Sequence, residues 1–468
     1  MASKDSAGNM LPFFSTIDNL VRGSSSNHSL NIRARTLIIA FVILIVTFFI
    51  LSPSQSLSNF SVLLFLSPIW IPLALIRFTA VRYVQAKRAE FFASQEYVLL
   101  ELRIPRDTSK TPKSMELFFA NMHIGTGETT WWKKFVLGNV RAWWSFEIVS
   151  IGGRVHFYIW TRVGFRRLVE SYLYAQYPGL EIIEAEDYAR VNDPLDADHD
   201  LWGCEYALKR PDPYPLKTYV DYEIEPGDKP EETVDPLAQL IELMGAIGPN
   251  EQMWLQFIVR QTKTEKWGGM FTTKKNAAGK TYTWKDEADE IIEELREKHS
   301  KKNTHVDPAT GAMIETQGFP NPTKGMNETI ASIERKTGKQ GFDVGIRCIY
   351  SGTKDAFQGI MVTALINLFK PFNDESRNNI GLASTFGGSF NDYPWEDRGG
   401  HRRTFLKGEV LRMYRYRSYY YDPYVGPWMI LSSEELATLY HIPSSAVTTP
   451  NLPRIQSATA GAPSNLPT

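Results

Sequence analysis

Two apolar runs near the N-terminus constrain this chain more than any other feature of its sequence. They cover residues 36–51 and 60–76, and neither the runs nor the residues between them contain an ionisable side chain. Each run is slightly shorter than the roughly 20 residues that a helix needs to cross a bilayer. Flanking residues or local thinning of the bilayer could make up the difference. We therefore expect a two-helix transmembrane hairpin within residues 33–79.

The charges around the hairpin predict its orientation. Arg33 and Arg35 precede it and Arg77 follows it, whereas the connection between the runs has no basic residue. By the positive-inside rule this pattern predicts a multi-pass protein of the cell (inner) membrane with both termini in the cytoplasm. A cleaved signal peptide fits poorly, because the first run starts late and a second run follows it. A buried helical hairpin stays open, and Pro68 and Pro72 also allow a hairpin that enters and leaves by the same face.

Composition indicates folded domains after the hairpin. The 468 residues include 51 basic and 52 acidic side chains, so the overall charge favours neither a strongly basic nucleic-acid binder nor an acidic disordered chain. Aromatic residues make up 13% of the chain, which indicates large buried surfaces. The two cysteines, Cys204 and Cys348, exclude a disulfide framework and are expected to be buried free thiols.

The residues after the hairpin predict a first ferredoxin-like domain over 97–200. Alternating apolar and polar residues predict strands, and apolar residues at helical spacing predict helices. Gly152 and Gly153 predict a tight turn between two of the strands. The expected elements, in the order βαββαβ, are 97–105, 114–122, 143–151, 154–161, 163–177 and 180–186.

The same order of elements is expected again in a second ferredoxin-like domain over 201–447. Asp235 is expected to cap its first helix, and a long polar insertion over 262–341 separates its central strands. Within the insertion, 285–302 reads as a solvated amphipathic helix. The expected elements are the strand 214–223, the helix 236–247, the strands 252–261 and 342–351, the helix 356–370 and a closing strand 427–431. The predicted fold class is thus α+β, with a transmembrane hairpin followed by two tandem ferredoxin-like units.

Three further segments complete the predicted organisation. Residues 1–32 are rich in Ser, Asn and Gly and are expected to be a disordered cytoplasmic tail. Residues 80–96 predict a juxtamembrane helix whose basic side chains lie among lipid headgroups. Residues 448–468 are rich in Pro, Ser, Thr and Ala and predict a flexible tail.

Sequence motifs of catalysis and cofactor binding are missing from the chain. Residues 278–281 resemble the end of a phosphate-binding loop, but Lys274 stands where that motif needs its first glycine. The eight histidines do not fall at metal-ligand spacing, and no nucleophile motif is present. We therefore predict no catalytic residue, no metal site and no cofactor.

One segment, 401–424, combines basic and aromatic residues. Such a mixture can hold single-stranded nucleic acid through phosphate neutralisation and base stacking. It can equally pack against a protein subunit or anionic lipid headgroups, and we favour protein packing. The candidate binding residues are Arg402, Arg403, Lys407, Arg412, Arg415, Arg417, Tyr419 and Tyr420.

Two long stretches resemble a known family. Residues 145–188 (SFEIVSIGGRVHFYIWTRVGFRRLVESYLYAQYPGLEIIEAEDY) and 430–458 (ILSSEELATLYHIPSSAVTTPNLPRIQSA) are similar to the membrane-anchored N-terminal region of conjugation and type IV secretion ATPases. In those proteins an ATPase domain with a Walker motif follows. The family's nucleotide-binding residues have no counterpart here, so the resemblance implies an anchoring and assembly region without the motor.

Together these observations predict a non-enzymatic membrane scaffold or docking subunit of a type IV secretion or conjugative DNA-transfer assembly. Its expected partners are the lipid bilayer, protein subunits of that assembly including a separate P-loop ATPase, single-stranded DNA, and further copies of itself. The alternative is a membrane-tethered module that binds single-stranded nucleic acid through 401–424.

Overall fold

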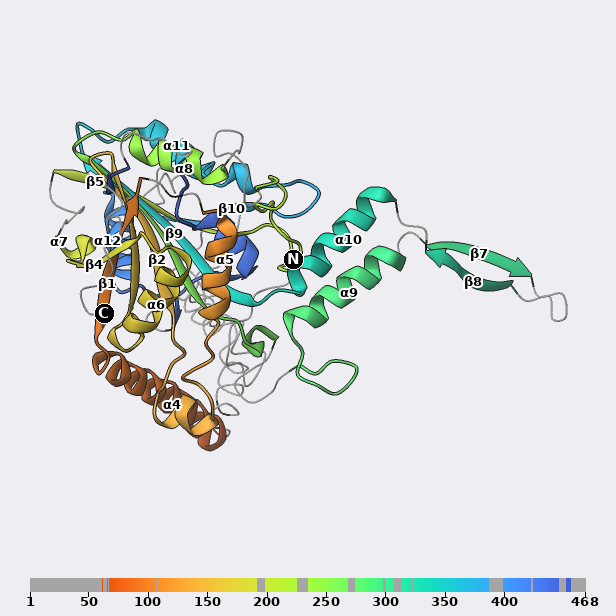
Figure 1. The fold of residues 1–468 in the computed structure, drawn as a ribbon. Coiled ribbons are helices and arrows are strands. Elements are labelled where there is room, and N and C mark those ends of the chain that lie inside the picture. Colours follow the sequence, from red (N-terminus) through yellow and green to blue (C-terminus); the bar gives the residue numbers. More distant parts are fainter. Residues whose placement is uncertain are drawn as a thin grey trace, which may run out of the picture.

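The structure is a computed structural model. It describes residues 61, 65, 67–106, 108, 110–191, 198–224, 235–267, 274–297, 300–306, 313–320, 323–386, 399–421, 424–445 and 452–455. Its helices and strands pack around one large antiparallel sheet, from which a helical arm projects (Figure 1).

The first half of the sheet has the strand order of a single βαββαβ unit. Its four strands lie in the order β4-β1-β3-β2, and each pairs with its neighbours in antiparallel fashion. The turn between β2 and β3 contains Gly152 and Gly153, both with positive φ (58° and 82°), which is why glycine is required there. The elements are β1 (Tyr97–Pro105), α5 (Pro112–Asn121), β2 (Trp144–Ile151), β3 (Arg154–Arg162), α6 (Arg166–Gln176) and β4 (Glu181–Ala185).

The second half repeats this strand order as β10-β5-β9-β6. Two of its strands differ from the prediction. The first strand of this half is β5, whereas the sequence predicted 214–223. Pro213 and Pro215 have no amide hydrogen to donate to a neighbouring strand, and the chain forms turns after them instead. The closing strand is β10, whereas 427–431 contributes to β13, which pairs with β9. The elements are β5 (His199–Leu208), α8 (Pro236–Gly245), β6 (Glu251–Gln261), β9 (Gly341–Thr353), α11 (Gly359–Ile366), β10 (Ile380–Phe386) and β13 (Met429–Ser432).

The two halves form one continuous sheet. Strands β2 and β6 pair in antiparallel fashion along the whole length of β2, from Trp144 opposite Val259 to Ile151 opposite Gln252. With β13 and the short β14 (Arg454–Ile455), which pairs in parallel with the end of β1, the sheet has ten strands. The predicted α+β class is confirmed, but the two repeats are halves of one sheet.

The predicted transmembrane hairpin is wrong. Its first run, 36–51, lies outside the described residues. The second run leads into α4 (Ser67–Ala93), a single helix that also takes in most of the predicted juxtamembrane segment and carries Arg77, Arg82, Lys87 and Arg88. Within the described ranges, no helix combines the length and the apolar character that crossing a membrane requires. The predicted multi-pass location in the inner membrane, with both termini in the cytoplasm, is therefore wrong as well.

Both faces of the sheet are covered. On one face, α5, α6, α8, α11 and α13 (Ser433–Leu439) contribute Phe119, Leu173, Ile241, Leu365 and Leu436 to one buried cluster. The other face is covered by the end of α4, by the helix α12 (His401–Arg415) and by three short elements (Figure 1). The short elements are α7 (Tyr188–Val191), β11 (Tyr420–Tyr421) and β12 (Tyr424–Val425).

A buried histidine fastens α13 to the start of α8. Asp235 caps α8 as predicted, since its Oδ1 accepts a hydrogen bond of 2.9 Å from the Leu237 amide. Its Oδ2 lies 3.0 Å from Nε2 of His441. Burial lowers the pKa of His441, but the Asp235 carboxylate outweighs burial and the pKa is raised. Burial raises the pKa of Asp235, but His441 outweighs it and that pKa is lowered.

This pair predicts a loss of stability as the pH rises above the ordinary pKa of histidine. Because the folded pKa of His441 is raised, its contribution is complete below its ordinary pKa of 6.5 and is lost as the pH rises through the folded value. A tenfold difference in proton affinity between the folded and unfolded states is worth about 1.4 kcal/mol of stability. We expect the free energy of unfolding, measured in urea, to fall as the pH rises above 6.5, and His441→Gln to flatten that decline. The same slope in both proteins would contradict the assignment.

Candidate functional site

The insertion between β6 and β9 forms a projecting arm. It consists of two helices that lead away from the sheet, with a two-stranded hairpin at the far end (Figure 1). Its elements are α9 (Trp284–Glu297), β7 (Ser300–Val306), β8 (Met313–Pro320) and α10 (Lys324–Thr337). The predicted helix over 285–302 therefore ends earlier, and the hairpin was not predicted from the sequence.

The two helices of the arm have a small core of their own. Ala288 and Ile292 of α9 pack against Ile330 and Ile333 of α10, separately from the two clusters of the sheet. At the base, the amide of Thr262 donates a hydrogen bond of 3.2 Å to the carbonyl of Gly341, so the arm leaves and rejoins the sheet at one point. The arm is thus a discrete element on a continuous sheet.

Ion pairs fix α10 to the body. The ammonium of Lys336 lies 3.0 Å from Glu435 of α13, and both side chains are 1% exposed. Burial lowers the pKa of Lys336, and the neighbouring Glu435 carboxylate offsets only part of this effect. Beside this pair, Glu434 receives Arg335 at 2.7 Å and Lys339 at 3.1 Å. These contacts set the direction in which the arm leaves the sheet.

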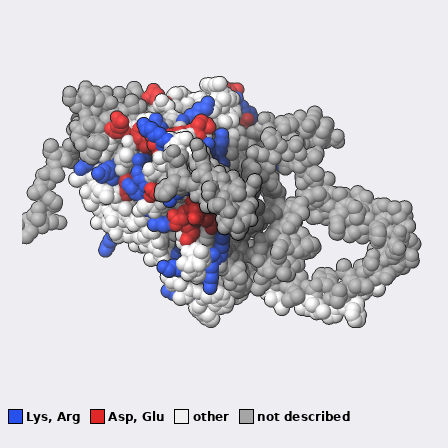
Figure 2. All heavy atoms as spheres, turned by 90° about the vertical axis from the view of Figure 1, so that its right-hand side faces the viewer, with Lys and Arg blue, Asp and Glu red and all other residues white. Residues whose placement is uncertain are grey.

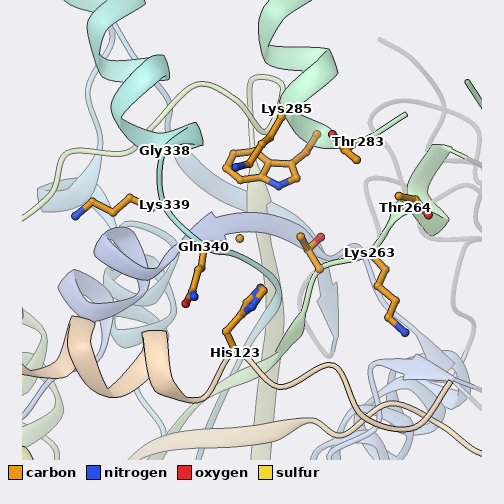
Figure 3. Close-up of a pocket in the computed structure, with 11 residues that line it drawn as sticks. His123, Lys263, Thr264, Thr283, Lys285, Gly338, Lys339 and Gln340 are labelled. Carbon is orange, nitrogen blue, oxygen red and sulfur yellow. The ribbon is translucent and has the colours of Figure 1, made fainter. Parts of the chain in front are cut away.

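A cavity of about 450 Å³ lies at the base of the arm (Figure 3). His123 points into it, Trp284 also lines it, and burial lowers the pKa of this histidine. Lys339 and Lys263 point away from the cavity. They bind a carboxylate of Glu116 and the carbonyl of Glu128, respectively. The lining does not present the converging charges that would define a charged ligand.

A row of polar side chains crosses the face of the sheet beneath α12. Neighbouring strands contribute residues that stand opposite one another in register, across seven strands. In order from β10 to β1 the row is Ser384, Glu205, Arg347, Gln256, Glu147, Tyr158 and Glu101. Burial of so many polar groups requires partners, and the covering segment supplies many of them.

Three of the predicted binding residues are buried against this face of the sheet. Arg417 is 1% exposed, and its guanidinium contacts Glu147 at 3.0 Å and Asp187 at 2.6 Å. Tyr419 packs over Gly345, where a Cβ atom would come within 2.3 Å of its ring. The hydroxyl of Tyr420 lies 2.6 Å from the carbonyl of Asp343. In this conformation neither tyrosine can stack on a base.

The other predicted residues belong to α12. Lys407 forms an ion pair with Asp200, and Nε of Arg415 donates a hydrogen bond of 2.7 Å to the carbonyl of Ala189. Arg412 is half exposed and lies 2.7 Å from Glu409. Arg402 and Arg403 lie in the first turn of the helix. The structure therefore divides the predicted set into a buried group and a group on the surface of α12.

Neither metal chemistry nor thiol chemistry emerges from the described residues. In that part of the chain no three His, Cys, Asp or Glu side chains gather as a metal site would require. Cys204 and Cys348 stand opposite each other in β5 and β9 as buried free thiols, as predicted, and burial raises the pKa of both. Burial also raises the pKa of Tyr188, whose hydroxyl donates to Glu147.

The comparisons with known proteins identify a family and no function. The comparison with curated proteins gives no match. A family model described as a domain of unknown function, DUF8128, matches residues 79–454, which include the arm and all of the sheet except its last residue, Ile455. The chain therefore belongs to the DUF8128 family.

Proposed function

We propose that this chain is a non-enzymatic docking subunit that binds protein partners through its arm. The observation that carries this proposal is the construction of the arm. Its helices have a core separate from that of the sheet, and its hairpin lies far from the body (Figure 1). A helical pair that only filled a gap in the fold would lie against the sheet.

Two further observations support a role without catalysis. The buried carboxylates of the polar row already have partners, since Glu147 receives Arg417 and Glu205 receives Arg347 at 2.8 Å. Catalytic carboxylates, in contrast, keep an open position for a substrate or a proton. Two of the lysines that line the cavity at the base of the arm, Lys263 and Lys339, point away from it (Figure 3).

Our proposal for the kind of assembly to which the subunit belongs rests on the sequence resemblance alone. Residues 145–188 include β2, β3, α6 and β4, and residues 430–458 begin at β13 and α13. Both stretches resemble the region that precedes the motor of conjugation and type IV secretion ATPases. We therefore propose a secretion or DNA-transfer assembly as the setting, with a P-loop ATPase as the partner.

The test removes the far end of the arm and keeps its base. In the shortened variant, residues 299–322 are replaced by a short Gly-Ser linker, which leaves the helix core and the ion pairs of α10 in place. We expect the intact chain, purified from its own cells, to recover a P-loop ATPase, and the shortened chain to recover about tenfold less, a loss typical of a removed binding hot spot.

The matched control is Lys324→Ala, because that side chain is 92% exposed at the same end of α10. It should recover as much ATPase as the intact chain. Equal recovery by the shortened and intact chains, or no protein partner with either, would refute the proposal.

A second candidate function is binding of single-stranded nucleic acid by the surface of α12. Phe405 and Tyr416 are each 64% exposed there, and Arg412 lies between them in sequence. Exposed aromatic and basic side chains on one helix suit stacking and phosphate contacts. Binding of a labelled oligonucleotide that weakens steeply with salt would support this candidate.

A further inference from the structure

The arm and α12 carry opposite charges. Helix α9 has seven carboxylates and two basic side chains. Helix α12 has five Lys and Arg side chains and one carboxylate. On the side of the molecule from which the arm projects, one patch of acidic side chains lies among basic and uncharged ones (Figure 2). The chain as a whole is nearly neutral, so this separation of charge is local.

Three acidic side chains of α9 line one exposed side of the helix, its acidic face. Asp289, Glu293 and Glu297 are exposed and follow one another at intervals of four residues, so they line the same side of the helix. Ala288 and Ile292 face α10. The acidic face is therefore turned away from the core of the arm and toward anything that approaches it from outside.

The exposed side of α12 has complementary chemistry. Phe405, Arg412 and Tyr416 are separated by seven and four residues and lie on one side of the helix. Arg402 comes three residues before Phe405 in the same helix, so it lies close to the same side. Aromatic residues and arginine are the residue types most enriched at protein interfaces, and here they stand opposite in charge to α9.

The two surfaces cannot meet within one molecule. The arm leaves the sheet on one side, and α12 lies toward the other side (Figure 1). The buried pair of Lys336 and Glu435 fixes the base of the arm to the body. The acidic face can therefore reach a basic α12 surface only on another molecule.

We propose that α9 of one copy docks on α12 of a second copy, with the acidic face of the arm against the stripe of Arg402, Phe405, Arg412 and Tyr416. This inference rests on the proposed docking function and names a second copy of the chain as a partner of the arm. Two different surfaces meet, so the contact is heterologous and repeats from copy to copy. It produces a ring where the rotation closes and a filament where it does not.

The test uses charge reversal on each surface and then mixes the variants. The arm variant carries Asp289→Lys and Glu293→Lys, and the helix variant carries Arg402→Glu and Arg412→Glu. Sedimentation velocity of the full chain at about 50 mM and about 500 mM salt measures self-association, which salt should weaken through screening. We expect each variant alone to associate about tenfold more weakly than the original chain, because like charges now face each other.

Mixing the two variants supplies the matched control. The reversed arm then meets a reversed helix, and the original arm meets an original helix, so every contact in the mixture is again between opposite charges. We expect the mixture to regain the association of the original chain, which also shows that both variants are folded.

Three results would overturn the inference. They are a chain that stays monomeric at low salt, variants that associate as the original does, and a mixture that does not recover. If the monomeric chain binds an oligonucleotide and the helix variant does not, α12 is a nucleic-acid surface instead. If a monomeric chain still recovers the ATPase, only the contact between copies is refuted. If the chain neither associates with itself nor recovers the ATPase, the docking function is refuted as well.

Discussion

Replacing Arg417 with methionine is expected to lower the free energy of unfolding by about 3–5 kcal/mol, the usual cost of removing one partner of a buried ion pair. Arg417 is 1% exposed and Glu147 is fully buried, so the substitution leaves a carboxylate without its cation inside the protein. Two carboxylates contribute to the effect, because Asp187 binds the same guanidinium. Chemical unfolding followed by tryptophan fluorescence measures the loss.

The backbone supports this assignment. Arg417 follows the end of α12 with φ of 48°, a left-handed conformation that glycine usually occupies after a helix. An arginine stays in this strained position because its side chain is bound by the surrounding carboxylates. Arg417→Gly would relieve the strain but lose the ion pairs, so we expect it to be destabilising as well.

Two variants separate this explanation from a general effect of substitution. Glu147→Gln, added to Arg417→Met, removes the uncompensated charge and should recover part of the lost stability. Arg415→Met, two residues earlier, removes a partly exposed side chain that donates to the carbonyl of Ala189, and should cost about 1 kcal/mol. Equal losses from Arg415→Met and Arg417→Met would contradict the role given to the buried pair.

The first half of the sheet could be predicted because its signals are local. The Gly152-Gly153 turn and the alternation on both sides of it define β2 and β3 from neighbouring residues alone. The same rules failed at 214–223, where β-favouring residues lie close to prolines. The pairing of β2 with β6, which unites the halves, joins residues more than a hundred positions apart. Local periodicity does not contain this information.

The hairpin was mispredicted because an apolar run gives no sign of where its helix ends. The described part of the second run is the start of a longer helix, α4, whose remaining length carries Arg82, Lys87 and Arg88. The last turns of this helix pack Phe91 and Phe92 against the covered face of the sheet. The charges after Ile76 were read as a flank of the membrane span, whereas they belong to the same helix.

The candidate binding segment 401–424 was identified from its basic and aromatic residues, and composition does not show which of these side chains are buried. The residues that decide its position lie elsewhere in the chain. Gly345 leaves room for the ring of Tyr419, and Glu147 and Asp187 bind Arg417. The alternation in β2 placed Glu147 on one face of a strand, but nothing in the sequence linked it to an arginine 270 residues later. Only the fold brings these groups together.

The base of the arm gives the second large prediction, because its orientation depends on a buried pair. Lys336→Met removes the cation that Glu435 receives, while this carboxylate keeps hydrogen bonds from the amides of Ser432 and Leu216. These bonds reduce the penalty, so we expect a loss of about 2–4 kcal/mol, somewhat below the usual range for a broken buried pair. Chemical unfolding measures the loss.

The same substitution should also loosen the arm, because the pair joins α10 to α13 where the arm meets the body. Hydrogen exchange should become faster in α10 than in the central strand β9, since local opening requires less free energy than global unfolding. Lys324→Met is the matched control, because the Lys324 side chain is 92% exposed in the same helix and its loss should leave both stability and exchange unchanged. Adding Glu435→Gln to Lys336→Met should restore part of the stability without restoring the protection of α10, since the charge is gone but the tether is still missing. Unchanged exchange in α10 after Lys336→Met would show that the other contacts at the base hold the arm without this pair.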